Sequence, residues 1–276
     1  MRLDYNELKA VVTVAIIMAS RLLGIFLILP VFSVYAEKYP GSSIAMAGVA
    51  FGIYALAQSV FQIPFGWASD KLGRKPVLLA GLLIFTVGSV LCAEATTINE
   101  LIIARIIQGM GAVSSVAIAA LGDLTRPQVR AQSFTIVGIT IGIAFLAAII
   151  VGPYLAAKIG FSSVFYVLAA SGALALVLTL FFFPKIDNGQ PVGNGQPVGE
   201  RAGFRALLRM PEMRRLLLAT VVVSLSVNLF VFVYPLTWTS LDVSDASLWK
   251  VYLISLIPAA LFVYPAVRMA EKKGRM

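Results

Sequence analysis

The sequence predicts an all-α membrane protein, and three observations support this prediction. Hydrophobic residues make up 59% of the 276 residues, charged residues make up 13%, and the mean hydropathy is +0.92. Soluble domains carry about 25% charged residues. Apolar runs recur along the whole chain, and about 20 apolar residues suffice for a helix to cross a bilayer. The runs lack the two-residue alternation of barrel strands, so helices are expected.

Eight apolar segments are expected to form membrane helices. In chain order they span 9–36, 43–69, 76–94, 98–122, 130–157, 162–183, 212–240 and 247–269. Several are longer than the minimum span, and tilt or extension beyond the lipid would accommodate the excess. The first and fourth segments each contain one arginine, which is unusual inside a membrane helix.

A long loop at residues 185–211 divides the chain. It separates an N-terminal six-helix half at 1–184 from the start of a second half at 212–276. The hexapeptide Asn-Gly-Gln-Pro-Val-Gly occurs twice in tandem in this loop, at 188–193 and at 194–199. Such a Gly- and Pro-containing composition is typical of a linker and does not build a core.

The distribution of cations predicts the orientation in the membrane. Of the 22 Lys and Arg residues, 17 lie on the side of the expected helices that carries both chain ends, and Lys38, Lys158 and Lys250 lie on the other side. Cytoplasmic loops of membrane proteins carry the excess of cations. We therefore expect a multi-pass protein of the inner membrane with its N- and C-termini in the cytoplasm.

Composition also bears on the class of function. The net charge of +9 lies in loops beside apolar segments, which indicates contact with the lipid bilayer and not with nucleic acid. The chain has no histidine and one cysteine, Cys92, so no disulfide forms within it. We find no metal-ligand cluster, nucleophile elbow or phosphate-binding loop. No catalytic residue, metal or cofactor is expected, and the protein is not expected to be an enzyme.

The decapeptide at residues 66–75, Gly-Trp-Ala-Ser-Asp-Lys-Leu-Gly-Arg-Lys, joins the second and third segments. Gly66 would permit close contact between helices. Gly73 would permit a turn with a positive φ angle. The decapeptide is therefore expected to form a tight helix–turn–helix connection on the basic side of the membrane.

Charged side chains form a candidate cluster at this connection. Asp70 lies at the negative end of a helix dipole and needs cationic or amide partners. Arg74 and Lys75 follow directly, and Asp123, at the end of the fourth segment, is a further anion within reach of Arg74. The pattern Gly-x-x-x-Asp-x-x-Gly-Arg-Lys resembles the signature loop of the major facilitator superfamily. The resemblance implies a latch that holds the two halves in the outward-facing state; solvated charges that only set topology are the alternative.

The resemblance covers nearly the whole chain. Within the superfamily, the runs Phe61–Pro76 and Leu121–Arg126 are most similar to the YajR-type transporters. The family implies twelve helices in two halves, of which about eight are present here. The motif at 70–75 has a counterpart at 271–276, so segments seven and eight look like a second copy of the first two. We expect an incomplete major-facilitator bundle; an eight-helix protein with its own architecture is the alternative.

The fourth segment contains Arg105-Ile-Ile-Gln108-Gly109-Met-Gly111-Ala112. Residues 105, 108, 109 and 112 share one helical face, so Gln108 is expected beside Arg105. An arginine within a membrane helix should face a partner or a water-filled cavity. The pattern resembles the superfamily motif that is linked to proton coupling, and a structural arginine held by backbone carbonyls is the alternative.

The fifth segment contains Gly152 followed by Pro153, which removes one backbone hydrogen bond and would kink the helix. The surrounding run resembles the antiporter motif of the family, Gly-x-x-x-Gly-Pro-x-x-Gly-Gly. Three of its glycines are alanines here, at positions 148, 156 and 157. The motif favours export, and a kink that serves only packing is the alternative.

Further residues are candidates for a central cavity. Arg21 could line that cavity or extend its charge to the membrane surface. The other candidates are polar or aromatic residues on the second and seventh segments: Tyr54, Gln58, Gln62, Asn228, Tyr234 and Trp238. The first three form one helical stripe, which could instead be a contact between helices.

The family resemblance implies a secondary active transporter that moves a small molecule by alternating access. The preferred hypothesis is efflux coupled to protons and driven by the proton gradient. The substrate is an unidentified small molecule, and the complete protein is expected to be a monomer. No Asp or Glu lies near the middle of a segment, so the proton carrier is expected at Asp70 or Asp123 or beyond the eight segments. The alternatives are an uptake symporter or facilitator, and a truncated fragment that does not transport.

Overall fold

The computed structural model describes residues 3–111, 113–183, 210–241, 247, 250–252 and 254. Within these residues it is built from helices, and the predicted all-α fold is confirmed. The helices are α1 (Tyr5–Ile28), α2 (Phe32–Ala36), α3 (Ile44–Leu72), α4 (Arg74–Glu94), α5 (Ile98–Met110), α6 (Ser114–Leu124), α7 (Pro127–Lys158), α8 (Phe161–Phe182) and α10 (Pro211–Thr239).

The described residues contain seven spans that are long and apolar enough to cross a membrane. They correspond to the first seven predicted segments, because α5 and α6 together cover one span, Ile98–Leu124. The eighth predicted segment, 247–269, and the loop 185–211 lie almost entirely outside the described residues. The boundary of the second half at 212 falls in the first turn of α10.

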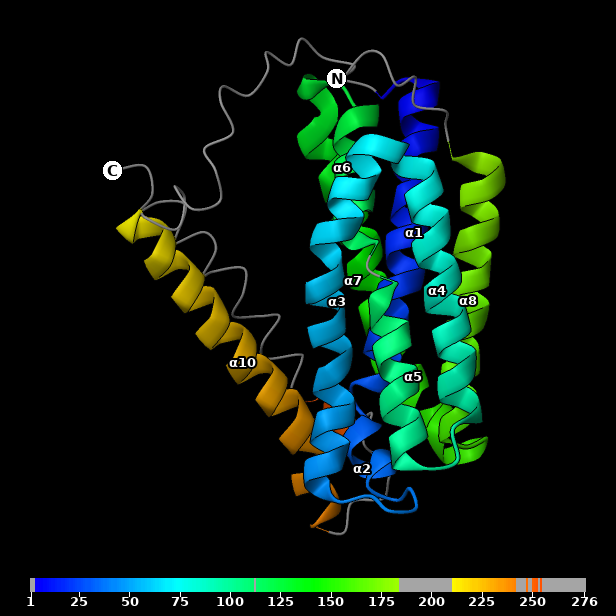
Figure 1. The fold of residues 1–276 in the computed structure, drawn as a ribbon, viewed down its shortest axis with the longest axis vertical. Coiled ribbons are helices and arrows are strands. Elements are labelled where there is room, and N and C mark those ends of the chain that lie inside the picture. Colours follow the sequence, from blue (N-terminus) through cyan, green and yellow to red (C-terminus); the bar gives the residue numbers. More distant parts are fainter. Residues whose placement is uncertain are drawn as a thin grey trace.

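Helices α1, α3, α4, α5, α6, α7 and α8 form one bundle (Figure 1). Within it, α1 packs on α7 and α8, α4 packs on α8 and α5, and α3 packs on α5. The α3–α4 and α6–α7 connections lie at the end of the bundle that carries the N-terminus, which we call the N-terminal end. Helix α2 and the α4–α5 and α7–α8 connections lie at the other end, which we call the distal end (Figure 1).

Two clusters of buried apolar side chains form the core of this bundle. The cluster toward the distal end is rich in aromatic residues, with Phe32, Phe85, Phe161 and Phe165 packed together. The cluster toward the N-terminal end is aliphatic and includes Leu78, Leu82 and Leu121. Packing of this kind between helices holds the polar side chains described below at fixed depths.

Helix α10 meets the bundle at the distal end and diverges from α3 toward the N-terminal end (Figure 1). It packs on α2 there, and the ring of Phe232 lies 5.7 Å from the ring of Phe51 on α3. The space that opens between α10 and the bundle is where the larger described pocket lies.

Two predicted segments are each broken into two helices. The first was expected to run continuously over 9–36, but α1 ends at Ile28 and α2 begins at Phe32. Pro30 lies in the break, and a proline lacks the N–H that would continue the helical hydrogen bonds. The expectation of one continuous helix was therefore wrong.

The fourth segment, expected over 98–122, is divided into α5 and α6 at Gly111. Gly111 has a ψ angle of +46°, outside the helical range. A Cβ atom at this position would lie 2.6 Å from the carbonyl oxygen of Gly81 on α4. Close approach of α4 thus accompanies the break, which places the N-terminus of α6 inside the bundle.

Candidate functional site

The α3–α4 turn forms as the decapeptide predicted. Gly73 has φ +92° and ψ +157°, a conformation that residues with a Cβ rarely adopt. It ends α3 and allows α4 to begin at once with Arg74. The guanidinium of Arg74 is thereby placed beside the last turn of α3.

Arg74 is the centre of a cluster that we call the latch cluster, composed of Asp70, Arg74 and Asp123. Its Nε–H donates to Oδ2 of Asp123 at 2.9 Å, and Nη1–H donates to Oδ1 of Asp70 at 2.6 Å. Nη1 also lies 2.6 Å from the hydroxyl oxygen of Ser69, which is buried. The cluster joins α3, α4 and α6 at the N-terminal end of the bundle.

Two other residues of the decapeptide lie outside the latch cluster. Lys75 donates through Nζ to the carbonyl oxygen of Leu180 at 2.8 Å, which ties α4 to the last turn of α8. Gly66 was expected to permit close contact between helices. A Cβ atom at Gly66 would meet no atom within 4 Å, so that expectation was wrong for this arrangement of the described helices.

The same end of the bundle has a second ion pair, which was not predicted from the sequence. The Nε and Nη2 atoms of Arg126 each donate to one carboxylate oxygen of Glu7 at 2.8 Å. The backbone N–H of Arg126 donates to Glu7 as well, at 3.1 Å. Glu7 also accepts from the backbone N–H of Asp4 at 3.0 Å. The hydrogen bonds with Glu7 raise the pKa of Arg126, so Arg126 stays protonated.

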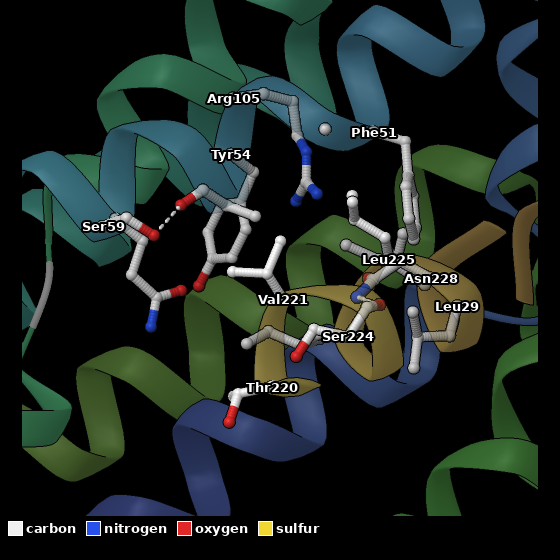
Figure 2. A pocket seen from close by; sticks show the side chains of 15 residues that line it. Leu29, Phe51, Tyr54, Ser59, Arg105, Thr220, Val221, Ser224, Leu225 and Asn228 are labelled. Atoms are coloured by element: carbon white, nitrogen blue, oxygen red, sulfur yellow. Dashed lines mark hydrogen bonds between the residues drawn. The ribbon is translucent and has the colours of Figure 1, made fainter. Parts of the chain in front are cut away.

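A pocket of about 530 Å³ lies between α1, α3, α5 and α10 (Figure 2). Its described lining mixes apolar side chains with hydroxyl and amide groups, and Arg105 is the one charged residue among them. Figure 2 shows Arg105 and Tyr54 directed toward the side chains of Val221, Ser224 and Asn228 on α10. Volumes of this order suit a small organic molecule.

Arg105 is buried with 3% of its surface exposed. Its Nη1–H donates to Oε1 of Gln108 at 2.7 Å, and its Nε–H donates to the carbonyl oxygen of Ala50 at 3.3 Å. The guanidinium carbon lies 4.4 Å from the ring centroid of Tyr54 and 5.2 Å from that of Phe32. Neutral oxygens and aromatic faces thus surround the cation, and no carboxylate pairs with it among the described residues.

Gln108 and its neighbours hold this arginine in place. The side-chain amide of Gln108 donates to the hydroxyl of Ser89 at 2.9 Å, so the glutamine links Arg105 to α4. A Cβ atom at Gly109 would lie 2.5 Å from the carbonyl oxygen of Tyr54. Glycine is therefore required for the close contact of α5 with α3. Ala112, predicted on the same face, lies outside the described residues.

The other cavity candidates divide between the pocket and its surroundings. Tyr54, Gln58 and Asn228 line it, whereas Gln62 is not among the lining residues. Tyr234 and Trp238 form an aromatic pair with their centroids 6.1 Å apart, away from the lining. Lining residues that the sequence analysis did not single out include Ser59, Thr220 and Ser224. Short hydroxyl side chains on an apolar helix are too common to have marked them.

Arg21 lies outside this pocket and does not reach the membrane surface. Only 1% of its surface is exposed, and Nη1 donates to the hydroxyl of Ser114 at the start of α6. Its guanidinium carbon lies 6.0 Å from the ring centroid of Phe85. Arg21 is thus an interior residue of the bundle. It neither lines the described pocket nor extends its charge to the membrane surface, the two positions expected from the sequence.

Gly152 lies at the contact of α7 with α1. A Cβ atom there would lie 2.3 Å from the carbonyl oxygen of Leu27, so the two helices touch through their backbones. Pro153 follows inside α7, and the alanines at 148 and 156 are buried. Close packing therefore persists where the family motif has further glycines.

Comparison with known proteins decides the family. The model of the Major Facilitator Superfamily matches residues 14–276. The chain belongs to the major facilitator superfamily. Its members are transporters, and the resemblance identified from the α3–α4 decapeptide is confirmed.

Among major facilitator relatives, the inner membrane transport protein YajR of Escherichia coli (strain K12) is 33% identical over 271 residues, which is 98% of this chain and 59% of YajR. The class H tetracycline resistance protein of Pasteurella multocida is 33% identical, with 65% of this chain and 46% of that protein covered. The chain thus spans about half to three fifths of the length of these relatives.

A solved major facilitator structure has the same fold. It is a bacterial homologue of the human lysosomal transporter Spinster, in an inward-facing and unoccupied conformation. The TM-score is 0.76 at 17% sequence identity, with 90% of this chain and 59% of that chain covered. The likeness concerns the fold alone, and it agrees with the bundle of α1 to α8 together with α10.

Proposed function

We propose that this protein exports a small amphipathic molecule in exchange for protons by alternating access. The observation that carries the proposal is the pocket in which Arg105 faces α10. Helices on both sides of the 185–211 loop line this pocket, as a site that is exposed alternately to the two sides of a membrane requires. The bound molecule would place apolar groups against Phe51 and Leu225 and polar groups near Arg105.

Arg105 is proposed to couple transport to protons. It is a buried cation, and a buried cation favours the ionised form of an acidic group that enters its surroundings. Protonation of such a group would weaken the attraction and release it. The latch cluster would then control opening at the N-terminal end, with Asp70 and Asp123 as the titratable carboxylates that contact Arg74.

The direction of transport is proposed to be outward. Two observations support export: α7 retains the Gly152–Pro153 pair in close backbone contact with α1, and one relative is named for tetracycline resistance. The location is proposed to be the inner membrane with the N-terminal end in the cytoplasm, since the positive charges gather there. We propose that the complete protein acts as a monomer in the lipid bilayer.

Everted membrane vesicles provide the test. Respiration acidifies their lumen, which a pH-sensitive acridine dye reports by quenching. Addition of tetracycline, and in separate trials of other small amphipathic compounds, should restore the dye fluorescence in vesicles that contain the protein. The reason is that each molecule carried into the lumen is exchanged for protons that leave the lumen. Vesicles without the protein and vesicles with Arg105→Ala are the controls. Proton-dependent accumulation in right-side-out vesicles, without recovery in everted ones, would establish uptake and contradict the proposal.

A further inference from the structure

The guanidinium of Arg21 has hydrogen-bond donors without partners. This side chain is 1% exposed and lies within the membrane span of α1. Its Nη1 donates to the hydroxyl of Ser114, but Nε and Nη2 are buried and have no acceptor among the residues that the structure describes. Within the described part of the chain, no carboxylate forms an ion pair with Arg21. A buried cation in this position is costly unless something pairs with it.

The two free donors lie on the same edge of the guanidinium. Nε–H and Nη2–H are parallel, and that edge matches the two oxygens of a planar oxyanion. The same pair of atoms on Arg126 binds the two carboxylate oxygens of Glu7, both at 2.8 Å. Arg21 therefore presents the edge that this chain already uses elsewhere to bind a carboxylate.

The N-terminus of α6 contacts the same guanidinium at its Nη1 atom. Helix α6 begins at Ser114, which accepts the hydrogen bond from Arg21, and its N-cap residue is Val113, which has no side-chain acceptor. The N–H groups in the first turn of a helix have no carbonyl partner within the helix, and the dipole there favours negative charge. The hydroxyl of Ser115 in this turn is also buried, and it has no partner in the described part of the chain.

We propose that Arg21 and the first turn of α6 form a binding site for a small free oxyanion such as formate or nitrate. The ligand would accept hydrogen bonds from Nε and Nη2 of Arg21, from the Ser115 hydroxyl and from first-turn N–H groups. The site is separate from the pocket at Arg105, because neither Arg21 nor the first turn of α6 lines that pocket. It does not rest on the proposed direction of transport.

The test is anion binding by the purified chain in detergent. Formate or nitrate replaces chloride at constant ionic strength, and thermal unfolding together with the line width of ¹³C-formate reports binding. We expect a saturable rise of the unfolding temperature with formate and with nitrate that chloride does not produce. Absence of saturable binding would mean that solvent satisfies the two donors, and would overturn the proposal.

Variants separate the guanidinium edge from charge alone. Arg21→Lys keeps the charge without the paired donors and should weaken formate binding about tenfold or more. Ser115→Ala should weaken it about threefold to tenfold while leaving the fold unchanged. Arg130→Gln is the control, because it removes an exposed cation that donates to the carbonyl oxygen of Gly122. This variant should bind formate as tightly as the unchanged protein does. Equal binding by Arg21→Lys, or equal loss in Arg130→Gln, would contradict the site.

Benzoate distinguishes a free ion from the carboxylate of a larger molecule. It presents the same two oxygens on an aromatic ring, and the site at Arg21 is enclosed by buried side chains. We expect benzoate to bind at least about tenfold more weakly than formate, because its ring would have to displace the buried side chains that enclose Arg21. Binding as tight as that of formate would overturn the assignment to a small free ion.

Discussion

Arg74 and Asp123 are joined across 49 positions of sequence by a hydrogen bond of 2.9 Å between Nε and Oδ2. Three residues after Asp123, Arg126 binds Glu7 through two further bonds. The short α6–α7 connection is therefore fastened to α4 on one side and to α1 on the other. This end of the bundle is held by charge-assisted hydrogen bonds that a change of conformation can break and re-form.

Replacement of Asp123 by Asn should destabilise the α4–α6 contact. The pair is partly exposed, so the expected loss in the free energy of unfolding is about 1 kcal/mol. Asp70→Asn is the matched variant, since Asp70 contacts the same guanidinium but is more exposed and lies only four residues from Arg74 in sequence, and its loss should be below about 0.5 kcal/mol. Thermal unfolding in detergent compares them. Equal losses would show that Asp123 has no special part in holding α6.

Replacement of Glu7 by Gln should cost more than either change in the latch cluster. The Glu7 side chain is 9% exposed and accepts two bonds from one guanidinium, so a loss of about 1–3 kcal/mol is expected. Asp4→Asn is the control, because Asp4 is 76% exposed and lies 3.6 Å from Arg126. A double-mutant cycle with Arg126→Gln should give a coupling energy of the same size. A coupling near zero would contradict the pairing.

Replacement of Gly152 by Ala should separate α7 from α1. The added Cβ would lie 2.3 Å from a backbone oxygen that cannot rotate away, so a loss of about 1–3 kcal/mol is expected. Gly142 on the same helix is the control: a Cβ there meets no atom of the described residues within 4 Å, and alanine should be neutral or stabilising by up to about 1 kcal/mol. If both variants unfold at the same temperature, the close contact of α7 with α1 is not as described.

Single cysteines test the orientation. A cysteine at Ile159, which is 70% exposed in the α7–α8 connection, should react with a membrane-impermeant maleimide in intact cells. A cysteine at Gln128, exposed near the start of α7, should react only after permeabilisation. The native Cys92 is buried and should contribute little background. The reverse pattern of labelling would place the N-terminal end outside the cell.

Sequence patterns predicted what depends on local spacing. The i, i+3 relation placed Gln108 beside Arg105, and the turn at Gly73 placed Arg74 near Asp70. Apolar length predicted the spans, since crossing a bilayer depends on little else. The contact between Arg74 and Asp123 could be anticipated because both lie at helix ends on one side of the membrane.

Contacts that depend on packing could not be predicted. Glu7 and Arg126 are 119 residues apart, and nothing in either neighbourhood indicates the other. The break at Gly111 reflects close approach of Gly81 on α4, which the pattern of α5 does not contain. The position of Arg21 at the N-terminus of α6 could not be inferred either, because α6 has a separate N-terminus only where the break at Gly111 divides it from α5.

The central claim is that Arg105 couples proton movement to transport through the pocket beside α10. Its most direct test compares the unchanged protein with Arg105→Lys and Arg105→Ala for drug uptake into everted vesicles under an imposed pH gradient, with stability in detergent measured in parallel. Our account predicts gradient-driven uptake that is lost in Arg105→Ala and partly retained in Arg105→Lys, while both variants stay folded. Full gradient-driven uptake by an Arg105→Ala protein of sharply reduced stability would show that Arg105 is structural and contradict the account.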